Sequence, residues 1–180
     1  MNASRQPNTT PKRRVFLALW PDEAIRGELH HLAHGLDVGG RPVPRAHLHL
    51  TLAFPGTIEA ERADCLAARL DELSFDPIPV LLDRVGHFER ARVAWAGPSR
   101  CPAALDRLAA RARGLCLACG VQTEARPFAP HVSLRRHARA PDTPALGAPI
   151  HWFADRIVLI ESGSQGNPGP YRLLAGWPEG

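Results

Sequence analysis

The sequence predicts an α+β fold made of a single domain with two lobes. Strand-like segments alternate with amphipathic helical segments, which is typical of layered folds that contain both elements. Several strand-like segments are separated only by a short turn, and this favours a mixed or antiparallel sheet over a parallel one. A four-residue pattern also recurs 82 positions apart, nearly half of the 180 residues, which suggests two corresponding lobes.

The first strand and helix follow a polar N-terminus. Residues 1–13 are polar and basic and are expected to form a flexible tail, which leaves 14–180 as the domain. The apolar run at 15–20 predicts a short strand. A helix is then expected to begin near Pro21 and to end at Gly35, because isoleucine and leucine recur at helical spacing between them.

The middle of the chain predicts a strand, a helix and a hairpin. Residues 37–46 are rich in Gly and Pro and predict a loop, whereas 47–54 alternate between apolar and polar side chains as a half-buried strand does. Thr57 can cap the helix that follows, whose apolar residues recur at helical spacing. Two strands at 78–88 and 92–97 are expected to form a hairpin.

The remainder predicts one helix and three strands. A third amphipathic helix is expected to begin at Pro102 and to end at Gly120. The proline-rich segment 138–150 is expected to be a loop. The three expected strands lie at 131–136, 152–162 and 171–177.

Composition places the chain among globular proteins. Hydrophobic residues make up 44% of it and charged residues 22%, which excludes disorder of the whole chain. The sequence has no apolar run of the length that a membrane-spanning helix needs, and the run at 15–20 is too short for a signal peptide. We therefore expect a cytoplasmic protein. The net charge of +4 permits a phosphate-bearing partner without demanding one.

The chain has four cysteines, Cys65, Cys101, Cys116 and Cys119. Disulfides are rare in cytosolic proteins, so we expect all four to be free thiols. Cys116 and Cys119, followed by His131 and His137, mimic the spacing of a zinc finger, but such fingers carry the cysteines on a hairpin and the histidines on a helix. The expected order here is the reverse, so we interpret the two cysteines as packed apolar groups and expect no metal.

The recurring pattern is a histidine, an apolar residue, a hydroxyl residue and a leucine, beginning at His49 and again at His131. Side chains two apart on a strand project to the same face, so each histidine lies beside a hydroxyl, Thr51 or Ser133. If the two strands face each other, one imidazole can accept a proton while the other donates one. The hydroxyls can donate hydrogen bonds to phosphoryl oxygens, so this set suits in-line displacement at phosphorus without a metal.

Five segments resemble the 2H phosphoesterase superfamily, which is named after two such histidine motifs. They read RVFLALWP, HLHLTLAFPGTI, VGHFERARVAWAG, RPFAPHVSLRR and ADRIVLIESGSQGNPGPYRLLAGWP, and they cover most of the chain from Arg14 to Pro178. Within the superfamily, the chain is similar to the bacterial and archaeal RNA 2',3'-cyclic phosphodiesterases, also called 2'-5' RNA ligases (LigT-like). It departs from them at Pro55 and Ser133, where leucine and threonine are commoner.

The resemblance implies a bilobal fold with an antiparallel sheet in each lobe, helices outside and an active site in the central cleft. It implies hydrolysis of a terminal ribose 2',3'-cyclic phosphate to a 2'-phosphate, with 2'-5' joining of RNA ends as the reverse reaction. His49 would protonate the leaving 3'-oxygen, and His131 would activate water. Thr51 and Ser133 would bind phosphate oxygens.

The resemblance also implies the partners. RNA ends or nucleotides that carry a 2',3'-cyclic phosphate are the expected ligands. No cofactor, metal or membrane is expected, and the protein is expected to be a monomer.

An arginine beyond the second motif is expected to contact phosphate or ribose, and two candidates stay open. The family often has arginine five residues after the second histidine, which is Arg136 here. Regular strand alternation instead places Arg135 on the face of His131. A bulge in the strand would favour Arg136, which is our preferred choice.

Other side chains have less specific signals. Phe16 and Trp20 are candidates for stacking a nucleobase, although most aromatic residues on apolar strands belong to the core. His47 shares the face of His49 and is interpreted as a residue at the rim of the cleft. Ser162 has no adjacent base and is interpreted as structural.

Three alternative functions stay open. The same chemistry could act on another cyclic nucleotide or on a 2'-5' linked oligonucleotide. The chain could instead bind RNA ends without catalysis, although the presence of both histidines argues against this. It could also bind zinc through Cys116 and Cys119, which metal analysis of the purified protein would decide.

Overall fold

The computed structural model describes residues 11–123, 126–163 and 170–178. In chain order, the elements within these ranges are β1 (Lys12–Leu19), α1 (Glu23–Gly35), β2 (Arg41–Pro42), the 3-10 turn η1 (Arg45–His47), β3 (Leu50–Glu59), α2 (Ala60–Ala68), the 3-10 turn η2 (Leu70–Leu73), β4 (Ile78–Phe88), β5 (Val93–Gly97), α3 (Ala103–Ala118), β6 (Val132–Arg136), β7 (Ala145–Ala154), β8 (Ile157–Ser162) and β9 (Tyr171–Trp177). Residues 1–10 of the expected tail (1–13) lie outside the described residues, and β1 begins two residues before the expected start of the domain at residue 14.

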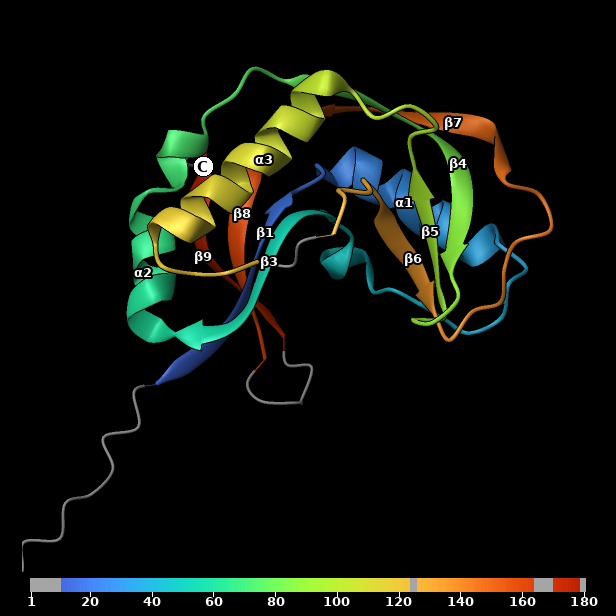
Figure 1. The fold of residues 1–180 in the computed structure, drawn as a ribbon. Coiled ribbons are helices and arrows are strands. Elements are labelled where there is room, and N and C mark those ends of the chain that lie inside the picture. The colour runs from blue at the N-terminus through green and yellow to red at the C-terminus, as the bar shows by residue number, and fades with distance from the viewer. Residues whose placement is uncertain (1–10, 124–125, 164–169, 179–180) are drawn as a thin grey trace, which may run out of the picture.

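The nine strands of the described residues form one antiparallel sheet, in which two halves meet edge to edge. One half has the order β3-β1-β8-β9 and the other has the order β7-β4-β5-β6 (Figure 1). These halves are the two expected lobes, but they share a continuous sheet. The pairing of Leu50 with Val132 joins β3 to β6, and the short strand β2 pairs farther along β6.

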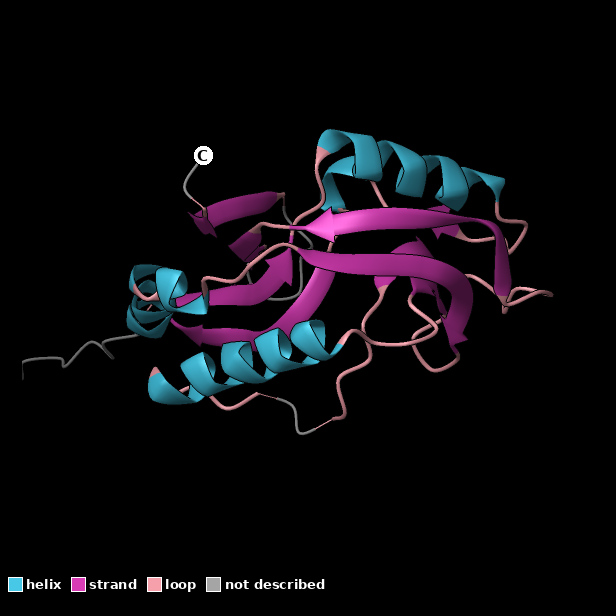
Figure 2. Ribbon diagram, turned by 90° about the horizontal axis from the view of Figure 1, so that it is seen from above, coloured by secondary structure: helices cyan, strands magenta, loops and turns pink. Residues whose placement is uncertain are grey.

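Two of the helices, α1 and α3, cross between the two halves of the sheet. Helix α1 follows β1 in the chain but packs against β6 and β7 of the other half. Helix α3 follows β5 but packs against β3, and α2 contacts β1 and β3. Figures 1 and 2 show α1 beside one half and α2 and α3 beside the other. None of the described helices is long and apolar enough to cross a membrane.

Helix α1 illustrates how the sequence sets an element. The side chain of Asp22 accepts a hydrogen bond from the backbone N–H of Ile25 at 2.8 Å, which satisfies one donor that the first turn leaves unpaired. Ile25 and Leu29 then point into the core. The helix ends at Gly35, so both of its expected boundaries are confirmed.

Two expected boundaries around the first motif are wrong. Strand β3 begins at Leu50, so His47 lies in a 3-10 turn instead of the strand. The strand also continues to Glu59, so Thr57 lies inside it and caps no helix. Continuous pairing of β1 with β3 as far as the pair Lys12–Glu59 explains why the strand runs past Pro55 and Gly56.

The expected loop at 138–150 and the expected strand at 152–162 are also wrong. Ala145–Ala154 forms β7 and Ile157–Ser162 forms β8, with a turn between them. Strand β7 lies at the edge of the sheet. An edge position tolerates proline, because its missing N–H need not face a neighbouring strand.

Two cysteines are joined, which corrects the expectation of four free thiols. A disulfide links Cys65 on α2 to Cys119 at the C-terminal end of α3, whereas Cys101 and Cys116 are free. The expectation relied on the reducing conditions of the cytosol, which keep most thiols free. A disulfide also depends on which thiols the fold brings close together. Here α2 and α3 cover the same half of the sheet.

Replacing Cys65 by alanine is expected to lower the free energy of unfolding by about 4 kcal/mol, because the disulfide closes a loop of 54 residues. Urea unfolding under oxidising conditions measures this loss, with Cys101→Ala as the control that leaves the bridge intact. A reductant should lower the stability of the wild type but not that of Cys65→Ala. Equal stability of oxidised and reduced wild type would contradict the prediction.

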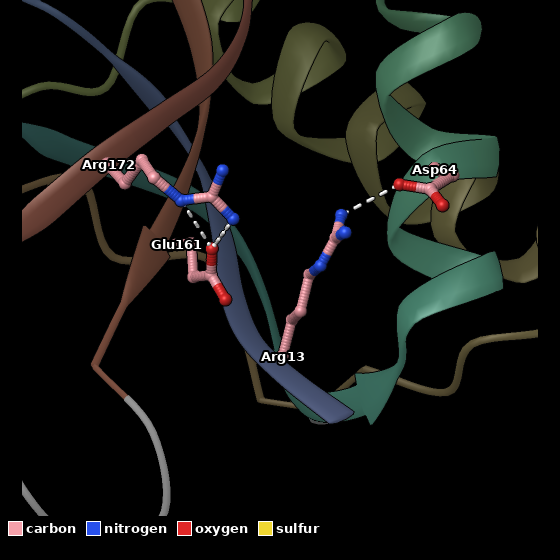
Figure 3. Close-up of polar contacts among 4 residues, drawn as sticks. All are labelled: Arg13, Asp64, Glu161 and Arg172. Atoms are coloured by element: carbon pink, nitrogen blue, oxygen red, sulfur yellow. Dashed lines mark hydrogen bonds and ion pairs between the residues drawn. The ribbon is translucent and has the colours of Figure 1, made fainter. Parts of the chain in front are cut away.

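Two ion pairs tie elements of the first half together at its surface (Figure 3). Arg13 on β1 reaches Asp64 on α2, with 2.7 Å between Nη1 and Oδ1. Arg172 on β9 pairs with Glu161 on the neighbouring strand β8. Both pairs have at least one well-exposed partner, so they contribute little to stability and mainly fix where these side chains lie.

Candidate active site

A single backbone pairing brings the two histidine motifs together. Leu50 and Val132 directly follow the motif histidines, and they are antiparallel partners at the junction of β3 and β6. Both side chains are fully buried in the core. Because neighbouring side chains on a strand project to opposite faces, the residues before and after this pair project to the other face of the sheet.

Four motif side chains therefore gather on one face. The register, continued by one residue on each side, places His49 opposite Ser133 and Thr51 opposite His131. Opposed residues of an antiparallel pair have Cβ atoms roughly 5 Å apart, and diagonal neighbours are roughly 7 Å apart. The imidazoles occupy one diagonal of this square and the hydroxyls occupy the other.

The backbone holds both imidazoles in the same tautomer. Nδ1 of His49 donates a hydrogen bond to the carbonyl of His47, and Nδ1 of His131 donates one to the carbonyl of Ala129, each at 2.7 Å. A carbonyl oxygen only accepts, so Nδ1 carries a proton in both rings. Nε2 of each ring is therefore the atom that can take up or release a proton in a reaction.

Aromatic side chains fix the ring of His49. Phe16 stacks on it with 4.6 Å between ring centroids, Trp20 stacks at 6.0 Å, and Tyr171 meets it edge-on at 5.7 Å. Phe16 is only 3% exposed. These contacts show that Phe16 and Trp20 support the imidazole, and Phe16 also lines the first cavity described below. Their expected stacking on a nucleobase stays a prediction.

A second aromatic group surrounds His131. Phe88 meets its ring edge-on at 4.8 Å, and Trp95 lies at 6.2 Å. Trp95 reaches this place because its strand partner is Gly86. A Cβ atom at that glycine would lie 2.2 Å from the indole ring, so no larger residue leaves room for Trp95.

Burial makes both rings weaker bases than free imidazole. It lowers the pKa of His49 to about 4, and the charges of His131 and Arg136 act in the same direction. The hydrogen bond to the carbonyl of His47 opposes this shift without cancelling it. Burial also lowers the pKa of His131. At neutral pH, both histidines of the ligand-free protein are therefore neutral.

The lowered pKa of His49 predicts a loss of stability in acid. The unfolded chain binds this proton below about pH 6.5 and the native protein only below about pH 4, so the unfolded state holds more protons between these values. Stability therefore falls as the pH falls, by up to about 3 kcal/mol from this group. Urea unfolding at pH 7 and pH 4 should show a smaller loss for His49→Gln than for the wild type. An equal loss would contradict the prediction.

A first cavity of about 550 Å³ opens beside His49. Thr51, Ser133 and Arg136 also line it, so it contains three of the four motif side chains and one of the two candidate arginines. The described residues that line it include no aspartate or glutamate. Its positive charge and hydroxyl donors suit an anion.

A bulge decides which arginine faces this cavity. The pairing of β5 with β6 shifts between Ala94, which faces Arg135, and Trp95, which faces Ser133. Leu134 is therefore the extra residue of a bulge, and the side chain alternation changes there. Arg136 lines the cavity as a result.

Arg135 lies elsewhere. Its guanidinium donates hydrogen bonds to the carbonyls of Ala33, Gly39 and Gly40, at 2.7 to 3.0 Å. These carbonyls lie at the end of α1 and in the loop after it. The structure thus places Arg135 as a link between β6 and α1, outside the cavity lining.

A second cavity of about 630 Å³ opens beside His131. It shares Thr51 and Phe54 with the first cavity, so the two meet between the motifs. Phe54 lies at this junction with 37% of its surface exposed, and the guanidinium of Arg14 lies 5.0 Å from its ring centroid. The motif histidines therefore open on two different cavities that share a border.

The first cavity also contains side chains that the sequence did not single out as binding residues, namely Arg14, Ser162 and Tyr171, along with His47 at its rim. Strand alternation from Phe16 could have indicated Arg14. Ser162 and Tyr171 face each other across β8 and β9, far from either motif in sequence, and they have no local signal. Among the described residues, no group of three His, Cys, Asp or Glu side chains is placed to hold a metal ion.

Comparisons with known proteins identify the family. The LigT like phosphoesterase family matches residues 19–95. The RNA 2',3'-cyclic phosphodiesterase of Escherichia coli (strain K12) is 34% identical over 128 residues, which cover 70% of this chain and 73% of the relative. This chain belongs to the LigT-like 2H phosphoesterases.

Solved structures of LigT-like 2H phosphoesterases extend the match to nearly the whole chain. The apo structure of E. coli LigT has a TM-score of 0.77 and 30% identity, and covers 92% of this chain and 96% of its own. E. coli LigT complexed with 3'-AMP has a TM-score of 0.78 and 29% identity, with 93% and 98% coverage. The α+β fold and the family that the motifs predicted are therefore confirmed.

Proposed function

We propose that this LigT-like 2H phosphoesterase hydrolyses the terminal 2',3'-cyclic phosphate of RNA to a 2'-phosphate, without a metal ion. The observation that carries the proposal is the pairing of Leu50 with Val132, which gathers two imidazoles and two hydroxyls on one face. Relatives from E. coli, Archaeoglobus fulgidus and Aeropyrum pernix are named RNA 2',3'-cyclic phosphodiesterases, which supports it.

The two imidazoles divide the proton transfers. Nε2 of His131 takes a proton from water, whose oxygen forms a bond to phosphorus. The bond from phosphorus to the 3'-oxygen breaks on the opposite side, and Nε2 of His49 gives that oxygen its proton. Each transfer contributes typically ~10²–10⁴ to the rate.

The first cavity holds the phosphate. Thr51 and Ser133 donate hydrogen bonds to its non-bridging oxygens, where negative charge increases in the transition state. Arg136 and Arg14 add positive charge from the same cavity, and no acidic residue of the described lining opposes them. Tyr171 and His47 stack at 4.0 Å and border the space that remains for the ribose and its base.

The substrate itself helps to protonate His49. In the free protein the low pKa of His49 leaves the ring neutral, so it lacks the proton that the leaving oxygen needs. A bound phosphate anion offsets the charge of Arg136 and attracts a proton to the imidazole. The pKa of His49 is therefore expected to be higher in the complex than in the free protein.

The decisive test is incubation of the purified protein with a short RNA that ends in a 2',3'-cyclic phosphate, in the presence of a chelator. The expected product carries a 2'-phosphate, which is identified by releasing the terminal nucleotide and comparing it with 2'-phosphate and 3'-phosphate nucleotide standards. A 3'-phosphate would reverse the leaving-group assignment of His49. Binding without any product would instead identify a non-catalytic RNA-end protein.

A further inference from the structure

A third cavity, of about 350 Å³, opens beside the first one. His47 and Tyr171, whose rings stack, line both cavities and form the border between them. Trp20 also lines the third cavity, and its ring centroid lies 6.0 Å from that of His49. The third cavity therefore begins one aromatic ring away from the imidazole to which the proposed function assigns the leaving oxygen.

Strand alternation extends the face of the candidate site into this cavity. Strand β8 pairs with β1, and just before β8 the carbonyl of Arg156 accepts a hydrogen bond from the backbone N–H of Trp20 at 2.9 Å. Side chains two apart on a strand project to the same face, and Arg156, Val158 and Ile160 all line the third cavity. Val158 and Ile160 are buried and apolar, so the charge of this wall comes from Arg156.

The positive charge of Arg156 has no counterpart among the described residues. Its side chain forms no hydrogen bond or ion pair with any of them, and its Nε atom is buried. The described lining of the third cavity contains no aspartate or glutamate. Asp71 lines a neighbouring cavity that Arg156 also borders, but the two side chains form no ion pair. A buried donor without an acceptor costs free energy, which a bound anion would offset.

The proposed substrate carries an anion in the right direction. In a nucleotide with a 2',3'-cyclic phosphate, the 5'-oxygen extends from the ribose away from that phosphate. With the cyclic phosphate in the first cavity and the ribose against His47 and Tyr171, the 5'-oxygen is directed to the third cavity. In RNA this oxygen carries the phosphodiester that links the last nucleotide to the one before it.

We infer that Arg156 binds the phosphate on the 5' side of the reacting nucleotide, so that the third cavity distinguishes RNA ends from free cyclic nucleosides. This inference rests on the proposed function and adds a specificity-determining residue to it. A guanidinium can donate two parallel hydrogen bonds to one phosphate. The contact lies away from the reacting bonds and is equally strong in the ground state and the transition state, so it lowers KM and leaves kcat unchanged.

The test compares substrates that differ in their 5' phosphate. Uridine 2',3'-cyclic phosphate with a 5'-hydroxyl, the same nucleotide with a 5'-phosphate, and a trinucleotide with the same cyclic end are hydrolysed in turn. The values of kcat and KM are measured for the wild type, Arg156→Gln and Arg156→Lys. Arg107→Gln is the matched control, because Arg107 is exposed on α3 and lines none of the three cavities.

In the wild type and in Arg107→Gln, the 5'-phosphate nucleotide and the trinucleotide are each expected to have a KM about tenfold lower than the 5'-hydroxyl nucleotide, at similar kcat. Arg156→Gln should lose this difference, and Arg156→Lys should keep part of it because lysine retains the charge. A difference that persists in Arg156→Gln would overturn the inference. A wild type that shows no preference for the trinucleotide over the 5'-hydroxyl nucleotide would also overturn it.

Binding of product analogues separates this inference from the proposed function. The affinities of uridine 2',5'-bisphosphate and uridine 2'-phosphate are measured by calorimetry, which needs no turnover. The wild type should bind the bisphosphate about tenfold more tightly, and Arg156→Gln should bind both alike. That result in a protein that hydrolyses no cyclic phosphate would support the Arg156 site and overturn the proposed function. Equal affinities in the wild type would overturn the Arg156 site, whether or not the protein hydrolyses cyclic phosphates.

Discussion

Replacing either His49 or His131 by alanine is expected to lower the turnover of cyclic-phosphate RNA by a factor of about 10³ or more. Each ring supplies one proton transfer, and such a transfer typically contributes ~10²–10⁴ to the rate. The double variant should be little worse than either single variant, because the two transfers belong to one displacement. Rates with saturating substrate in chelator measure the effect.

Two controls separate loss of chemistry from loss of structure. His49→Gln keeps the volume and one hydrogen bond of the buried ring but cannot carry the proton, so it should be as inactive as His49→Ala while it stays folded. His151→Ala removes an exposed histidine from β7 and should keep full activity. If a folded His49 or His131 variant turns over at near the wild-type rate, the assigned roles are wrong.

Removing the motif hydroxyls is expected to have the second largest effect. Thr51→Val and Ser133→Ala should each raise the barrier by about 2–4 kcal/mol, which is the usual cost of losing one donor to a developing anion. Valine has nearly the same shape as threonine, so a loss of activity in Thr51→Val measures the contribution of the hydroxyl and not a change in packing. Comparison of kcat for each variant with that of the wild type measures the barrier.

A conservative variant provides the control for this prediction. Thr51→Ser keeps the donor and loses only a methyl group, so it should retain most of the activity that Thr51→Val loses. The opposite substitution, Ser133→Thr, should also be tolerated. Unchanged rates in both Thr51→Val and Ser133→Ala would contradict a role for these hydroxyls in binding the phosphate oxygens.

The sequence predicted the strands and helices best where one periodicity was uninterrupted. Helix α1 has a capping aspartate at one end and a glycine at the other, and both boundaries were correct. Strand β7 was missed because Pro149 and Gly147 are typical of loops, yet an edge strand tolerates them. Thr57 was predicted to cap a helix because threonine is a common capping residue, which can be read from the local sequence. It lies inside β3 because that strand pairs there with Arg14 of β1, a contact that the local sequence does not indicate.

The candidate site was predictable as far as the two motifs extend. His49, Thr51, His131 and Ser133 followed from strand alternation and from the resemblance of the motifs. The choice of Arg136 depended on a bulge that no pattern in the sequence fixes. The aromatic rings around both histidines and the lining by Tyr171 come from strands far away in sequence, so only the assembled sheet brings them together.

The exchange of helices between the two halves has a consequence for cooperativity. Neither half can bury its apolar face with helices from its own part of the chain. Helix α1 follows β1 but covers the half that contains β6 and β7, and α3 follows β5 but covers the half that contains β3. One continuous cluster of buried side chains then spans the junction. The lobes therefore melt as one unit, and the spacing of the acid and the base persists until the whole domain unfolds.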